Sequence, residues 1–186
     1  FKFLRRRKER KLFVIGLDCA EPTLVFERWK DQLPNLRQLM TNGVYGRLTS
    51  SIPCITVPAW SSMLSSTDPG VLGIYGFRNR SDHSYSNMST ATGTAVHQKR
   101  VWELLGEAGK QVICVGIPQT YPVRPVNGLL ISDFLTPTVQ QQYTHPHTLR
   151  TDIDRILGGE EYEVDVRDFR TDDKDNLLRQ IYEMTE

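Results

Sequence analysis

The sequence predicts an α/β fold in which a mostly parallel sheet is flanked by helices. Two near-continuous apolar runs, 11–17 (KLFVIGL) and 111–117 (QVICVGI), are typical of parallel strands that helices cover on both faces. Helical periodicity separates these runs. The resulting order of strand, helix, strand, helix and strand favours a parallel sheet.

The remaining elements follow from local patterns. Two more strands are expected at 44–50 and 129–132. Helices are expected at 22–30, 34–40, 58–65, 99–107 and about 146–157, and from about residue 173 onward. The polar stretch 67–98 contains few long apolar side chains, which predicts a long surface loop, and such loops are often functional.

Composition excludes several classes of protein. With 186 residues, 39% of them hydrophobic, the chain is typical of one soluble globular domain. Its longest apolar run is the length of a strand, far short of the roughly 20 residues of a membrane-spanning helix. No secretory signal pattern follows the basic start. The cysteines are three in number and far apart, which predicts reduced, mostly buried thiols in a cytoplasmic protein.

Charge is concentrated at the start of the chain. Residues 1–11 hold seven Lys or Arg and one Glu, a net charge of +6, so the remaining residues carry −5. We expect residues 1–11 to form a solvated basic arm, the alternative being a weak contact with an anionic surface. Because the rest of the chain is mildly acidic, specific nucleic-acid binding is not expected.

Two polar residues are placed where chemistry is common. Asp18 follows the first apolar run, at the sheet edge where α/β proteins bind ligands. Thr56 precedes the predicted helix that starts at Pro58. A hydroxyl there faces the free N–H groups of the helix, which favour an anion such as phosphate. Thr56 is therefore a candidate nucleophile if a metal ion lowers its pKa.

Each of the two residues has a simpler interpretation. Asp18 could only terminate the strand or cap the next helix. Thr56 could only be the N-cap of its helix, a role that threonine fills commonly.

The surroundings of these residues resemble the type I phosphodiesterase/nucleotide pyrophosphatase family of the alkaline phosphatase superfamily. The segments VIGLDCAEP and LPNLRQLMTNGVYGRLTSSIPCITVPAWSSMLSSTDPGVLGIYGF carry the resemblance, which spans roughly residues 11–80. Asp18 matches a metal-binding Asp after an apolar strand, and Thr56 matches the nucleophile of a P-x-x-T-x-P segment. Residues 67–69 and 73–74 match the T-[GD]-x-x-P-x-x-x-G-I stretch that follows.

The resemblance implies an alkaline-phosphatase-like fold and metal-dependent hydrolysis of phosphodiester or pyrophosphate bonds in a small phosphate-ester substrate. Two divalent ions are implied, zinc being favoured and manganese the alternative, with Asp18 and the Thr56 oxygen as ligands of one of them. Attack by Thr56 would give a phosphoryl-threonine intermediate that water then hydrolyses. Cys54 does not fit the C-x-P-x-R pattern of sulfatases, which excludes that branch.

The sequence departs from the family pattern in two places. Nucleotide pyrophosphatases place a phosphate-contacting Asn about three residues after the Gly-Ile pair, where this chain has Phe77. Asn79 could take over that contact, while Tyr75, Phe77 or Tyr85 could stack on a planar group or only anchor the loop. The family's later Asp and His ligands are not found, because His83, His97, His145 and His147 lack the expected contexts and are predicted to be surface histidines.

These departures suggest the N-terminal part of a larger domain. We expect a basic arm at 1–11, an α/β core with a catalytic half-site at 12–136, and a helical, acidic segment at 137–186 that leads into a substrate-covering region. The remaining metal ligands would then lie outside this chain. The alternatives are a non-catalytic fragment that binds a phosphate ligand, and a phosphoryl-transferring mutase or phosphonate hydrolase of the same superfamily.

Overall fold

The computed structural model describes residues 10–166 and 169–185. It divides the chain into two compact units, Phe1–Thr49 and Ser50–Glu186, and each is described by itself. The division falls within the predicted core of residues 12–136. Most of the predicted basic arm, residues 1–9, lies outside the described residues.

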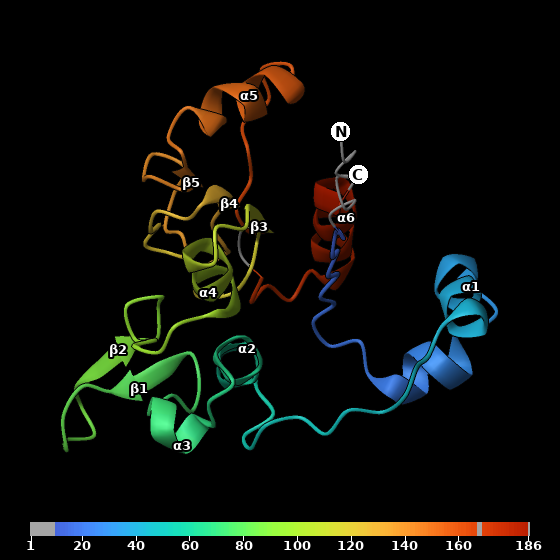
Figure 1. The fold of residues 1–186 in the computed structure, drawn as a ribbon, viewed down its shortest axis with the longest axis horizontal. Helices are drawn as coiled ribbons and strands as arrows, with labels where there is room; N and C mark the ends of the chain where they lie inside the picture. Colours follow the sequence, from blue (N-terminus) through green and yellow to red (C-terminus); the bar gives the residue numbers. More distant parts are fainter. Residues whose placement is uncertain (1–9, 167–168, 186) are drawn as a thin grey trace, which may run out of the picture. The chain divides into compact units, whose positions relative to one another are not determined.

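The first unit contains the two helices that the sequence predicts there. A π-helix spans Leu24–Arg28, and the Trp29 N–H donates to the Leu24 carbonyl at 2.8 Å, the five-residue spacing of that helix type. Helix α1 spans Pro34–Asn42 and starts with proline, whose missing N–H would be unpaired at a helix start anyway. Figure 1 shows α1 as the light blue helix.

The segments 11–17 and 44–50 are not strands in this structure, contrary to the prediction. Both sheets lie within residues 78–145, so neither segment takes part in a hydrogen-bonded ladder among the described residues. Their apolar side chains are exposed, with Phe13 at 85% and Leu48 at 83%. The pattern of an apolar run indicates a preference for burial, but a strand also needs a neighbouring strand to pair with.

The second unit holds the remaining helices and all the described strands. The helices are α2 (Thr56–Ser65), α3 (Pro69–Leu72), α4 (Val101–Glu107), α5 (Leu149–Ile156) and α6 (Lys174–Thr185). The strands are β1 (Arg78–Arg80), β2 (Met88–Thr90), β3 (Val112–Val115), β4 (Gly128–Ile131) and β5 (Thr144–His145). Apart from α3 and β1, β2 and β5, each matches a predicted element within a few residues.

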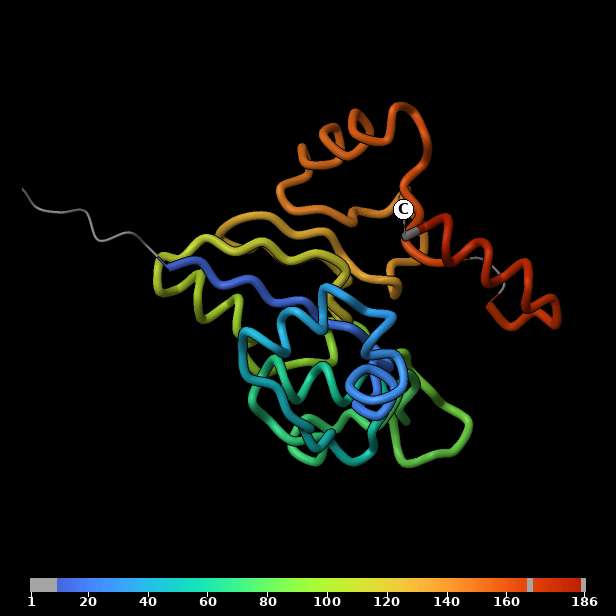
Figure 2. The backbone as a smooth tube through the Cα atoms, turned by 90° about the vertical axis from the view of Figure 1, so that its right-hand side faces the viewer, coloured from blue at the N-terminus to red at the C-terminus, as the bar shows by residue number. Residues whose placement is uncertain are grey.

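Strands β3 and β4, both expected from the sequence, pair in the parallel sense and run side by side in both views (Figures 1 and 2). One face of β3 is buried, because Cys114 packs with Trp102 of α4 and Leu130 of β4. β5 joins β4 in the antiparallel sense, so this small sheet is mixed. The fold is therefore mixed α/β, and the carboxyl ends of β3 and β4 meet at one sheet edge.

The polar stretch 67–98 contains more structure than a loop. Asp68 caps α3, since its carboxylate accepts from the Gly70 and Val71 N–H groups at 2.8 and 3.1 Å. Strands β1 and β2 then form an antiparallel hairpin. The sequence does not reveal this hairpin, because its three-residue strands are largely exposed and show no apolar alternation.

The cysteines are less buried than predicted. Cys114 is buried, but Cys19 and Cys54 are exposed. Burial raises the pKa of the Cys114 thiol to about 11, which disfavours the reactive thiolate near neutral pH. Within the described ranges, no helix has both the length and the hydropathy that a membrane span requires.

Gly128 allows β4 to lie beside β3, and its replacement tests that pairing. Its φ is +148°, and a Cβ there would lie 1.9 Å from the Val112 carbonyl oxygen. Gly128→Ala should therefore lower the free energy of unfolding by about 2 kcal/mol or more. Chemical denaturation measures this effect. Gly76→Ala, where a Cβ meets no atom within 4 Å, is the matched control, and equal stability of the two variants would contradict the described register.

Candidate active site

Thr56 is the first residue of helix α2 and is half-buried. The cap position belongs to Ile55, and the helix start has no side-chain capping hydrogen bond. The structure therefore does not support the interpretation of Thr56 as only an N-cap. Pro58 has no N–H group, and the Ala59 N–H donates to the Ile55 carbonyl at 3.0 Å. The Thr56 and Val57 N–H groups thus remain without an intrahelical partner, at the positive end of the helix.

Buried contacts hold α2 in its unit. Val57 is fully buried in a cluster with Leu72, Ile74, Ala91 and Val96. Ser61, one turn further along α2, is 3% exposed. Its hydroxyl lies 2.6 Å from the Val57 carbonyl oxygen and also contacts the side-chain oxygen of Gln119. The helix that carries Thr56 is therefore fixed by both apolar and polar contacts.

A buried carboxylate lies at the carboxyl edge of the parallel pair. Asp133 follows β4 and is 1% exposed. It accepts the Gln119 N–H at 2.6 Å and the Tyr121 N–H at 3.2 Å, and both donors belong to the segment that follows β3. Burial raises the pKa of Asp133, and these backbone N–H groups oppose the rise.

Sequence reasoning missed Asp133, although the signal was present. A polar residue directly after an apolar strand is the feature that selected Asp18, and Asp133 follows the strand at 129–132 in the same way. Gln119 and the buried Arg100 carry no such signal. Arg100 donates to the Gln119 carbonyl at 2.8 Å and pairs with Glu103 at 3.2 Å.

Asp18 belongs to the first unit and Thr56 to the second, so each is described within its own unit. Asp18 is exposed and lies in a turn. The Cys19 thiol donates to its Oδ1 atom at 3.3 Å. This hydrogen bond and the negative charge of Asp18 raise the pKa of the Cys19 thiol.

The residues proposed to contact substrate lie after α3. The side chain of Asn79 stabilises a turn. Its Oδ1 accepts from the Tyr75 N–H at 2.9 Å, and its Nδ2 donates to the Gly76 carbonyl at 3.0 Å. The Phe77 ring lies 6.1 Å from the ring of Phe134, which favours a role as a loop anchor. Tyr75 is 55% exposed.

Among the described residues, no group of three or more His, Cys, Asp and Glu side chains could hold a metal ion. His83, His97 and His147 are exposed, and His145 is half-buried. Asp82, next to His83, accepts the Ser84 N–H at 2.7 Å and an Asn87 N–H at 3.1 Å. This carboxylate therefore shapes a turn.

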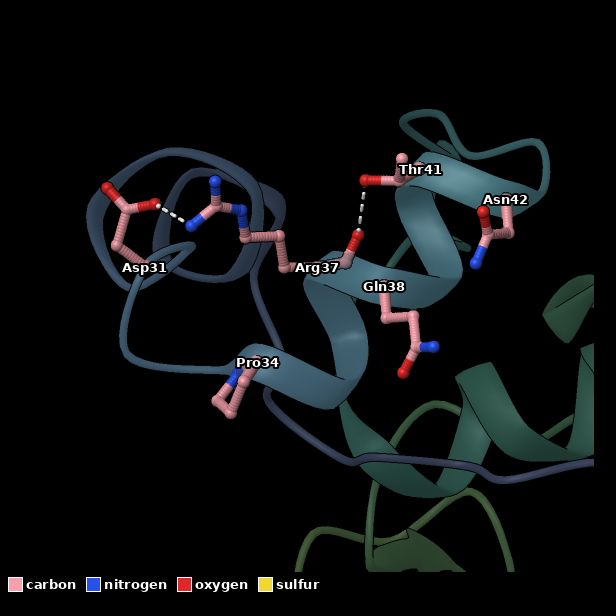
Figure 3. Close-up of a pocket in the computed structure, with 6 residues that line it drawn as sticks. All are labelled: Asp31, Pro34, Arg37, Gln38, Thr41 and Asn42. Carbon is pink, nitrogen blue, oxygen red and sulfur yellow. Dashed lines mark hydrogen bonds and ion pairs between the residues drawn. The ribbon is translucent and has the colours of Figure 1, made fainter.

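Two surface hollows have linings that do not suit a phosphate group. One, of about 340 Å³, lies along α1. Arg37 in its lining lies 3.0 Å from Asp31, and Figure 3 shows the two side chains paired. The other, of about 810 Å³, lies between residues 134–140 and 161–166. Three carboxylates line it, those of Glu161, Glu163 and Asp165. Their negative charge would repel a phosphate anion.

Among known protein families, one family model matches this chain. A family model described as type I phosphodiesterase / nucleotide pyrophosphatase matches residues 12–185. The comparisons with curated proteins and with solved structures found no match.

The role of Asp133 can be tested by replacing it with Asn. The carboxylate accepts from two backbone N–H groups, one at each oxygen. An amide has one oxygen, so it can accept from one of these donors, and its NH₂ group then faces the other donor. The free energy of unfolding should therefore fall by about 1–3 kcal/mol at neutral pH.

The pH dependence has a definite sign. Because the pKa of Asp133 is raised in the folded state, the folded chain holds this proton at higher pH than the unfolded chain does. The stability advantage of the wild type over Asp133→Asn should thus be largest at acid pH and decline as the pH rises through the raised pKa. Denaturation of both proteins across this range measures it, and an advantage that grows with pH would contradict the assignment.

Proposed function

The chain belongs to the type I phosphodiesterase / nucleotide pyrophosphatase family, and on that premise we propose that it hydrolyses phosphodiester or pyrophosphate bonds with Thr56 as the nucleophile. The family is one of hydrolases that act on phosphate esters and generally depend on metal ions. The observation that carries the proposal is the position of Thr56, in the matched segment and at the uncapped first turn of α2.

The chemistry proposed for Thr56 proceeds in two displacements. Its Oγ1 atom attacks the phosphorus in line with the departing oxygen, so that the Oγ1–P bond forms as the bond from phosphorus to the leaving group breaks. The hydroxyl proton goes to solvent, and the leaving group takes up a proton as it departs. Water then cleaves the Oγ1–P bond and regenerates the threonine hydroxyl.

The start of α2 supports this chemistry electrostatically. The Thr56 N–H group lies at the positive end of the helix, on a residue that is half-buried. Donors in this position attract the phosphate anion and stabilise negative charge on the threonine oxygen. Because Val57 is fully buried, this turn is held in place before substrate binds.

We propose Asp18 and the Thr56 oxygen as ligands of one of two divalent ions, zinc being favoured and manganese the alternative. The ion would lower the pKa of the threonine hydroxyl. These two oxygen donors do not make a complete site, and the described residues contain no cluster that would complete one. The other ligands are therefore proposed to lie outside the chain, with residues 137–186 leading into a substrate-covering region.

For substrate binding we propose Asn79, Tyr75 and Phe77. Asn79 has two N–H groups on Nδ2, and the turn uses one of them, which leaves the other for a phosphate oxygen. The exposed Tyr75 ring could stack on a planar group of the substrate. Phe77 would shape the site from its contact with Phe134.

A second candidate function is binding of a phosphate ligand without turnover. The lack of a three-ligand metal group among the described residues favours it. The two functions differ in what an assay would find, because a binding module would retain inorganic phosphate stoichiometrically and release no product. Transfer of the phosphoryl group to a second alcohol, as in a mutase, would give a phosphorylated acceptor instead, and cleavage of a phosphonate would break a P–C bond.

The nucleophile is tested by zinc-supplemented hydrolysis of an aryl phosphodiester by the natural full-length protein. Thr56→Ala should lower kcat by about 10³-fold or more, because alanine has no oxygen with which to form the covalent intermediate. Thr56→Ser should retain much of the activity, since it keeps the hydroxyl. Ser65→Ala removes a hydroxyl from the other end of α2, where it bonds the Ser61 carbonyl at 2.7 Å, and serves as the control. Full activity in Thr56→Ala would refute the assignment.

The metal ligand is tested by titrating zinc into protein first stripped with a chelator. Asp18→Asn should raise the zinc concentration needed for half-maximal activity by about tenfold or more, because a neutral amide binds zinc more weakly than a carboxylate. Asp31→Asn removes an exposed carboxylate of the same unit and should leave the zinc dependence unchanged. Identical titration curves for Asp18→Asn and wild type would rule Asp18 out.

A further inference from the structure

Gln119 combines a strained backbone with complete burial. It follows β3, is 1% exposed, and has a φ of +64°. Side chains with a Cβ rarely adopt this left-handed conformation, because the Cβ crowds the following carbonyl oxygen. Glycine would satisfy the backbone better, so the presence of glutamine indicates that its side chain is needed. Such outliers persist where the surrounding structure fixes them, and they cluster at functional sites.

The side chain of Gln119 joins two separate segments. Its Nε2 atom donates to the Ala91 carbonyl at 2.9 Å. Because a carbonyl oxygen can only accept, this contact fixes the orientation of the amide and turns Oε1 toward Ser61. The one hydrogen of the Ser61 hydroxyl is shared between two acceptors, Oε1 of Gln119 and the Val57 carbonyl oxygen. Both Gln119 and Ser61 are buried, so water does not compete for this bond.

The backbone of Gln119 is held equally firmly. Its N–H donates to Asp133 after β4, and its carbonyl accepts from the buried Arg100 before α4. A Cβ on Gly93 would lie 2.6 Å from the Gln119 carbonyl oxygen, so the neighbouring chain passes too close for a larger residue. These contacts attach Gln119 to the edge of the parallel pair, and its side chain extends that attachment to α2.

Ser61 lies five residues after Thr56 on the same helix. A regular helix of ten residues moves nearly as a rigid body. An anchor at Ser61 therefore fixes the rotation of α2 about its axis and its position along that axis, and with them the position of its first turn. The Ser61 hydroxyl also lies 2.6 Å from the carbonyl oxygen of Val57, the residue next to Thr56.

We infer that Gln119 is a positioning residue, which orients the Thr56 hydroxyl by anchoring Ser61 of α2 to the carboxyl edge of β3 and β4. This inference rests on the proposed function. A nucleophile displaced by about 1 Å from its line of attack can lose about 100-fold in rate. The anchor should therefore affect the chemical step and leave the binding of substrate unchanged.

The test uses three variants and a matched control, each assayed with an aryl phosphodiester in the full-length protein. Gln119→Gly keeps the left-handed backbone and its bonds to Asp133 and Arg100, and it removes only the side-chain contacts. Ser61→Ala removes the opposing hydroxyl, and the double variant combines the two. Thr120→Val is the control, because Thr120 is also buried in the same segment, and among the described residues its hydroxyl donates to the Ile117 carbonyl at 2.7 Å and not to α2.

Gln119→Gly and Ser61→Ala should each lower kcat by about 10- to 100-fold while KM stays within about twofold of the wild-type value. The double variant should be no slower than the slower single variant, because both changes break the same contact. Thr120→Val should keep the wild-type kcat. In hydrogen exchange, the α2 amides of Gln119→Gly should exchange faster, whereas those of β3 and β4 should not.

Three outcomes would overturn the inference: a wild-type kcat in Gln119→Gly, losses that multiply in the double variant, or an equal loss in Thr120→Val. If Gln119→Gly does not fold, Ser61→Ala decides alone, since it removes one oxygen atom and leaves the backbone of Gln119 intact. Wild-type turnover in Thr56→Ala would refute the proposed function together with this inference. Loss of turnover in Thr56→Ala with full activity in Gln119→Gly would refute the positioning role alone.

Discussion

The buried carboxylate of Asp133 is the contact on which the second unit depends. A carboxylate that is 1% exposed is costly to desolvate, and the Gln119 and Tyr121 N–H groups that point at it offset part of that cost. The segment after β3 must therefore curl toward the end of β4. This curl places Gln119 in its left-handed conformation and brings its side chain to α2. Loss of any one of these contacts would leave a buried polar group unsatisfied.

The reactivity proposed for Thr56 depends on two features of α2: the buried contacts that hold the helix, and the absence of a capping side chain at its first turn. Val57 and Ser61 fix the helix from its buried side. The first turn has no capping side chain, and Pro58 contributes no N–H group. The helix thus offers donors near Thr56 that an anion can use. A capped helix start would give up part of this electrostatic attraction, so the missing cap is consistent with membership of a phosphodiesterase family.

The sequence predicts elements whose contacts are local or strongly patterned, among them β3, β4, α1 and the position of Thr56 near a helix start. It fails where an element needs a partner that the pattern does not specify. The run 11–17 has the same apolar character as β3, yet β3 has β4 to pair with and the run has no ladder among the described residues. Asp133 directly follows an apolar strand, which is a pattern that the sequence shows. The role of Gln119 has no such signal, because no sequence pattern marks a glutamine with a left-handed backbone.

The most direct test of the account is to trap the covalent intermediate. The full-length protein would be mixed with a phosphodiester substrate, quenched in acid within its first turnover, digested and mapped by mass spectrometry. The account predicts an adduct on the peptide that contains Thr56, in which the phosphorus is bonded to the threonine side-chain oxygen and keeps the second ester group of the substrate, and no adduct in Thr56→Ala. Rapid turnover with an adduct on another residue, or with none under conditions that trap such esters, would contradict Thr56 as the nucleophile.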